Sequence, residues 1–217
     1  MDFGQTIMEA LVRIIPLVLS LTVHEFAHAW SAWKLGDDTA RMQGRLTLDP
    51  MAHIDPIGTL LLPALGVPFG WAKPVPVNPA RFRRGVNMDT GMMLTAIAGP
   101  LSNMLLAIGS AVTYGLMLRY SPETLEANAG VQRFITWMII GNVGLAVFNM
   151  LPIPPLDGSR VVEKFMPYSM RGSWEKVVQF GPFLLLGVLF FGRELISGPA
   201  AYILGMISSF VTGIAYG

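Results

Sequence analysis

Residues 24 to 28 read His-Glu-Phe-Ala-His, a pattern of two histidines and a glutamate typical of zinc hydrolases. On a helix, His24 and His28 lie four residues apart and project from one face, so both can bind a single metal ion. Glu25 lies beside them, where a carboxylate can act as general base toward a water molecule. The chain has no cysteine, so a metal must be held by nitrogen and oxygen. We therefore predict one catalytic Zn²⁺ with Glu25 as the base.

The motif lies in a stretch from Ile14 to Trp33 that is otherwise apolar and long enough to cross a bilayer. Ionisable groups at membrane depth cost about 2.5–3.5 kcal/mol each on insertion scales, so they usually serve a function. Hydrolysis of peptide bonds within a membrane is the prediction. The alternative is a polar pair that binds no metal and is hydrogen-bonded to neighbouring helices.

Composition supports a membrane protein, since 53% of the residues are hydrophobic and only 13% are charged. We predict an all-α polytopic fold with about six transmembrane segments and an N-terminal segment that is not a cleaved signal. The second segment contains three prolines, which favours a re-entrant or kinked helix. The predicted segments are 8–33, 54–69, 91–118, 132–151, 177–191 and 196–215.

The connections between these segments are all under about 25 residues, too short for an inserted soluble domain. We therefore predict a single membrane domain over residues 1–217. The net charge of +1 excludes nucleic acid as a partner, and the cluster Arg81, Arg83 and Arg84 marks a membrane boundary instead. The distribution of lysine and arginine weakly favours cytoplasmic termini.

A zinc site needs a third protein ligand. The extended motif with a third histidine would need glycine at 31 and histidine at 34, where this chain has Ser31 and Lys34. After Glu25 the next glutamate is Glu123, in a polar connection, so a downstream glutamate ligand fits poorly. The remaining candidates are Asp37, Asp38, Asp49, His53, Asp55 and Asp157.

We favour Asp157, which follows an apolar helix and three prolines at positions 152, 154 and 155. Prolines end a helix and force an extended segment, which at membrane depth must face protein or a water-filled cavity. Asp157 could then reach the metal, and Gly158 could supply a turn or a close approach. The alternative is an ordinary helix end with a surface aspartate.

Several stretches together resemble the site-2 protease family of intramembrane zinc metalloproteases. They are His24 to His28, Ala98-Gly-Pro-Leu-Ser-Asn103 and Asn149 to Gly158. Residues 44–58 and 71–79 are similar to the compact prokaryotic branch of the family, which lacks PDZ and other accessory domains. The resemblance implies an integral, multi-pass protein of a prokaryotic plasma membrane.

The resemblance also implies Asp157 as third zinc ligand and Asn149 as a group that stabilises the oxyanion or orients the substrate. The expected substrates are single-span transmembrane proteins or leftover signal peptides within the lipid bilayer. One departure is that Pro155 and Leu156 precede Asp157-Gly158, where the family often has Asn-Pro.

The segment 71–79 could bind an unwound substrate. Pro74 and Pro76 remove donors from one edge, while Val75 and Val77 keep theirs on the other, as expected of an edge strand. The alternative is a rigid loop between spans.

His53 could gate access to the zinc or bind it in a resting state, although a loop histidine is more often a surface or capping group.

Ala98-Gly-Pro and Asn103 lie in an apolar helix where small residues allow close contact, so we predict packing for them and not catalysis.

Two other functions fit the motif of His24, Glu25 and His28 less well. One is a metal-ion transporter, with His24, Glu25 and His28 lining an ion path. The other is an inactive relative that binds transmembrane helices, which would have no need of a base at Glu25.

Overall fold

The computed structural model describes residues 3–61 and 70–217. In those ranges the chain forms helices joined by loops, and no strand is present. The longer helices are α1 (Phe3–Lys34), α4 (Met88–Tyr120), α6 (Ala129–Asn149) and α10 (Arg193–Tyr216). The shorter elements are α2 (Thr39–Met42), η1 (Pro50–Ala52), η2 (Pro56–Leu61), η3 (Pro79–Arg81), α5 (Pro122–Ala127), α7 (Asp157–Phe165), η4 (Tyr168–Met170), α8 (Arg171–Gln179) and α9 (Gly181–Phe191).

Four helices are long and apolar enough to cross a bilayer: α1 from Leu11, α4, α6 and α10. A fifth span is present if the segment Tyr168–Gln179 and α9, which meet at an angle of 66°, are counted as one bent element. The predicted all-α polytopic membrane fold is confirmed. The number of six spans stays a prediction, because the described residues supply four or five.

The predicted segments 54–69 and 177–191 differ from simple spans. The first is a short helix, η2, up to Leu61, and its remainder at 62–69 lies outside the described residues. The second is broken at Phe180, after which Gly181 and Pro182 begin α9. With 11 residues, α9 is roughly 16 Å long, about half the thickness of the hydrocarbon core.

The predicted edge strand at 71–79 is not a strand in the structure. Residues 70–78 are neither helical nor paired with a strand among the described residues, and η3 begins at Pro79. Prolines at 74 and 76 lack the amide donors that a ladder needs. Its amides instead donate single hydrogen bonds, from Lys73 to the His53 carbonyl and from Val75 to the carboxylate of Glu25 on α1.

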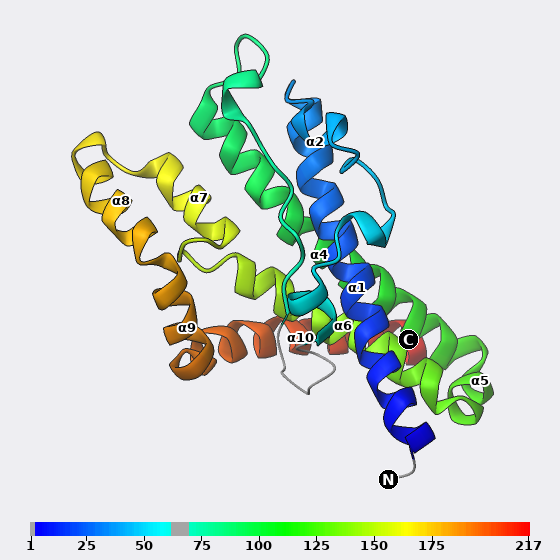
Figure 1. The fold of residues 1–217 in the computed structure, drawn as a ribbon. Helices are drawn as coiled ribbons and strands as arrows, with labels where there is room; N and C mark the ends of the chain where they lie inside the picture. The colour runs from blue at the N-terminus through cyan, green and yellow to red at the C-terminus, as the bar shows by residue number, and fades with distance from the viewer. Residues whose placement is uncertain (1–2, 62–69) are drawn as a thin grey trace.

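Helix α4 lies at the centre and packs against α1, α6, α7 and α10 (Figure 1). The buried parts of α1 and α4 are rich in small residues, which let helix backbones approach closely in a membrane. Further along α4 an apolar cluster joins it to α5, α6 and α10. The buried small residues are Ala29, Ala32, Ala96, Gly99 and Ala107, and the cluster contains Ala111, Leu125, Ile135, Ile139 and Val211.

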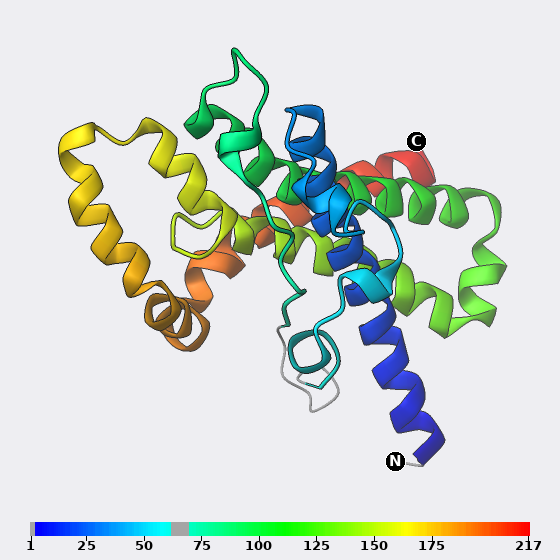
Figure 2. The same cartoon turned by 45° about the horizontal axis from the view of Figure 1, so that its top comes forward.

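Helices α7, α8 and α9 form a lobe to one side of the crossing pair α1 and α4, and both views show it (Figures 1 and 2). Helix α7 returns from this lobe to contact α4, so residues at the start of α7 can meet side chains of α1. Phe190 and Phe191 at the end of α9 are 76% and 90% exposed, as suits a surface that contacts lipid.

Candidate metal centre

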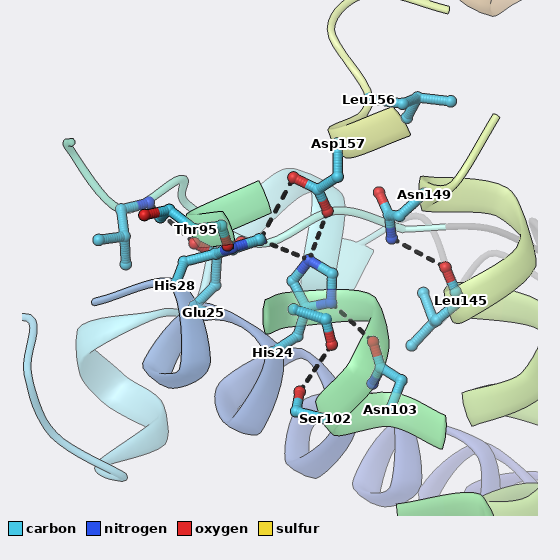
Figure 3. Close-up of polar contacts among 12 residues, drawn as sticks. His24, Glu25, His28, Thr95, Ser102, Asn103, Leu145, Asn149, Leu156 and Asp157 are labelled. Carbon is cyan, nitrogen blue, oxygen red and sulfur yellow. Dashed lines mark hydrogen bonds and ion pairs between the residues drawn. The ribbon is translucent and has the colours of Figure 1, made fainter. Parts of the chain in front are cut away.

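Three side chains from distant parts of the chain meet at one point (Figure 3). His24 and His28 project from α1, and Asp157 is the first residue of α7. The two Nε2 atoms are 3.0 Å apart, and each lies close to one oxygen of Asp157, at 3.2 Å from His24 and 3.4 Å from His28. The structure therefore brings together the three residues that the sequence nominated as metal ligands.

The loop before α7 positions Asp157. Helix α6 ends at Asn149, and the proline-rich residues 150–156 turn the chain so that α7 begins at Asp157. A Cβ at position 158 would collide with the carbonyl oxygens of Met150 and Leu151. Glycine is therefore required at Gly158 for a close approach, as the sequence suggested.

Hydrogen bonds on the far side of each ring fix how the histidines face the site. The Nδ1 of His28 lies 2.7 Å from the backbone oxygen of Thr95, and the Nδ1 of His24 lies 2.6 Å from the side-chain oxygen Oδ1 of Asn103. Both partners only accept, so each Nδ1 carries the hydrogen and each Nε2 presents a lone pair to Asp157.

This donor set fits zinc. Two imidazole lone pairs and a carboxylate converge within 4.8 Å of one another, and Oδ2 of Asp157 is buried without a hydrogen-bond partner among the described residues. Converging electron pairs repel one another unless a cation lies between them, and two histidines with one carboxylate form a common catalytic zinc set.

Glu25 is buried next to this group, but it is not a member of the ligand set. Its Oε2 accepts a hydrogen bond of 2.8 Å from the backbone amide of Val75. The segment 70–78 therefore passes directly beside the predicted base. Val77, two residues further on, donates no hydrogen bond from its amide to any described residue.

Asn149 is half-buried at the end of α6, next to Asp157 in Figure 3. Its Nδ2 donates a hydrogen bond of 3.0 Å to the carbonyl of Leu145 in its own helix. The amide that could donate to an oxyanion is thus satisfied within α6, and its catalytic role stays a prediction.

The other residues considered as third ligand lie outside the metal group. His53 is buried, with Nε2 at 2.8 Å from the Thr47 carbonyl, and a gating role for it stays a prediction. Asp37 is fully buried and accepts the amide of Asn78 at 2.6 Å. Asp49 and Asp55 accept amides of their own loops, and Asp38 pairs with Arg81.

Sequence reasoning missed the residues of α4 and α6 that support the histidines. It assigned Gly99 and Asn103 to packing, which is correct for Gly99, because a Cβ there would lie 2.5 Å from the His28 ring. Asn103, however, contacts His24 and is itself hydrogen-bonded to Asn142. The available signal was the spacing of Thr95, Gly99 and Asn103, which repeats every four residues like the two histidines.

Comparison with known proteins places these features in context. The model of Peptidase family M50 matches residues 87–189, a range that contains Asp157 but not the histidine pair. The Bacillus subtilis protein YwhC is 43% identical over 178 residues, covering 82% of this chain and 78% of YwhC. Rip2 of Mycobacterium tuberculosis is 31% identical over 178 residues, covering 82% of this chain and 66% of Rip2. Both are named as zinc metalloproteases, and no solved structure matches.

Proposed function

Because this chain belongs to peptidase family M50, the site-2 protease family, and is therefore a membrane zinc metalloprotease, we propose that it cuts peptide bonds in or near the transmembrane segment of single-span membrane proteins. The observation that carries the proposal is that His24 and His28, on a helix long and apolar enough to span a bilayer, meet Asp157 of α7, with Glu25 beside them. A hydrolytic site at that depth has access to bonds that soluble proteases do not reach.

In the proposed mechanism, His24, His28 and Asp157 hold the metal. Zinc bound there would lower the pKa of a water molecule and polarise the scissile carbonyl. Glu25 takes the proton of the attacking water and later transfers it to the leaving amine. Asn149 donates from Nδ2 to the developing oxyanion, which requires it to turn away from the Leu145 carbonyl.

Substrate binding is proposed at the segment 70–78. The carbonyls of a transmembrane helix are engaged in helical hydrogen bonds, so a bond can be cut only after local unwinding. An unwound substrate could then pair with the backbone amides of Val75 and Val77. The Val77 amide has no partner among the described residues, whereas the Val75 amide must first leave Glu25.

We further infer that residues 1–217 act as one membrane domain in the plasma membrane of a prokaryote, in agreement with the bacterial relatives. A metal-ion transporter would need ligands along a path across the membrane. The described residues contain one such group, that of His24, His28 and Asp157, which favours a localised reaction over a path.

The test compares wild type with Glu25→Gln and Asp157→Ala in detergent or bilayers, using a panel of single-span substrates and measuring bound zinc. We expect product from wild type only, full zinc occupancy in Glu25→Gln, and loss of zinc in Asp157→Ala. Glu175→Gln, which neutralises an exposed glutamate on α8, is the control and should cut normally. Equal product from all four proteins would refute the assignment, and zinc flux abolished by Glu25→Gln without proteolysis would favour the transporter.

A further inference from the structure

One face of α4 is built against the two histidines. Thr95, Gly99 and Asn103 follow one another at intervals of four residues, so they lie in a row along the helix. The row faces the ligand pair, with the Thr95 carbonyl at His28, Gly99 against both rings and Asn103 at His24 (Figure 3). A second asparagine, Asn142 on α6, is hydrogen-bonded to the side chain of Asn103.

The orientation of the Asn142 amide follows from its own helix. Its Nδ2 donates a hydrogen bond of 2.7 Å to the backbone oxygen of Met138, one turn earlier. A carbonyl only accepts, so the NH₂ group must face Met138 and the oxygen Oδ1 must face Asn103. Asn142 is fully buried, and water cannot replace either contact from bulk solvent.

Asn103 is then oriented in turn. Its Nδ2 donates to Oδ1 of Asn142 at 2.7 Å and to the backbone oxygen of Ser20 at 3.2 Å, which uses both amide hydrogens. Its own oxygen is left facing Nδ1 of His24 at 2.6 Å. Turning the Asn103 amide over would place oxygen against oxygen at two contacts and NH₂ against N–H at the third.

We propose that Asn103, held by Asn142, is a positioning residue that keeps His24 in the tautomer with hydrogen on Nδ1 and thereby sets the zinc affinity of the site. A neutral imidazole can carry its hydrogen on either ring nitrogen, and only Nε2 without hydrogen can bind a metal. The proposal rests on the zinc site of the proposed function, but it does not depend on which substrate is cut.

The two ligands differ in a way that supplies an internal reference. His28 is oriented by a backbone carbonyl, that of Thr95, which no side-chain substitution removes. His24 is oriented by a side chain that depends on another side chain. Substitution of Asn103 should therefore change the state of the His24 ring and leave the His28 ring as it was.

The experiment measures zinc affinity by competition with a chelator in the detergent-solubilised full chain, together with ¹⁵N NMR of labelled histidine. The chain has 3 histidines, so the ring signals are few. Asn103→Leu, which has a similar size but no acceptor, should lose about 10–100-fold in zinc affinity. In the zinc-free protein at a pH where the rings are neutral, its His24 signals should shift to a mixture of tautomers while those of His28 stay.

Rescue distinguishes positioning from a general loss of packing. Asn103→Asp keeps an oxygen acceptor at His24, although its second oxygen faces the oxygens of Asn142 and Ser20. It should keep the His24 signals in the wild-type tautomer and lose less zinc affinity than Asn103→Leu. Thr22→Val is the matched control, because it removes a buried hydroxyl two residues before His24 whose one hydrogen bond to a described residue is to the Val18 carbonyl of its own helix. It should bind zinc like wild type.

A second variant keeps the proposal testable if Asn103→Leu does not fold. Asn142→Leu leaves Asn103 in place but removes the acceptor that holds its amide, so we expect a smaller loss of zinc affinity, about threefold to tenfold, and the same mixed His24 tautomers. Wild-type affinity and unchanged His24 signals in a folded Asn103→Leu or Asn142→Leu protein would overturn the proposal. Zinc binding that responds as expected in a chain that cuts no substrate would support it while the proteolytic function fails.

Discussion

Gly99 allows a demanding test of the metal site. An alanine Cβ at this position would lie 2.5 Å from Cε1 and Nε2 of His28 and 2.6 Å from Cε1 of His24. Ordinary carbon contacts begin at about 3.4 Å, so both rings would have to retreat by roughly 0.9 Å in Gly99→Ala. Zinc ligands tolerate errors of about 0.2 Å. We therefore expect Gly99→Ala to lose zinc affinity by at least about 100-fold, and proteolysis with it.

The assay is zinc competition on purified protein, with far-UV circular dichroism to confirm that the helices are retained. Gly109→Ala is the matched control, since it makes the same change ten residues further along α4, where a Cβ would meet nothing within 4 Å. Both substitutions raise helix propensity by the same amount, roughly 1 kcal/mol, so any difference between them comes from the histidine rings. Zinc affinity in Gly99→Ala equal to that of Gly109→Ala would refute the geometry described here.

Three other predictions concern the ligands and the base. Asp157→Ala should lower zinc affinity by more than about 100-fold, measured by the same competition, whereas retention of tight binding would remove Asp157 from the ligand set. Zinc at 100 times its dissociation constant should stabilise the folded wild-type protein by about 2.7 kcal/mol, measured as a higher melting temperature with zinc than with excess chelator. Asp157→Ala should show no such difference, and an equal shift in both proteins would place the metal elsewhere. Hydrogen exchange of the Val75 amide should be faster in Glu25→Ala than in wild type, but nearly unchanged in Glu25→Gln, which keeps an acceptor. Equal exchange rates in all three proteins would mean that the 2.8 Å hydrogen bond from the Val75 amide to Glu25 is not formed in solution.

Local features of the sequence predicted much of the fold. The four long spans are visible as apolar runs, since a bilayer imposes a minimum helix length that any window of residues reveals. The pair His24 and His28 is equally local, because a spacing of four residues puts two side chains on one face of any helix. The break at Phe180 was missed, because the run 177–191 is apolar on both sides of it and only Gly181-Pro182 marks the turn.

The supporting contacts of the site depend on which helices face each other, and one sequence does not contain that information. Asn103 lies 79 residues from His24, and Asn142 a further 39 residues along the chain. Nothing local distinguishes an asparagine that faces a ligand from one that packs between helices. Asp157 was predicted as a ligand because its proline-rich approach implied a cavity and because the resemblance to the site-2 protease family implied it. Val75 was predicted to have a free amide, whereas the structure pairs that amide with Glu25.

The distance along the chain between the ligands has a consequence for biosynthesis. Asp157 is made about 130 residues after His28, which at cellular rates of roughly 5–20 residues per second is a delay on the order of 10 seconds. During that interval the two histidines lack the carboxylate that would complete the proposed ligand set. On the proposed ligand set, the metal centre is therefore complete only after Asp157 has been made and α7 has packed against α4.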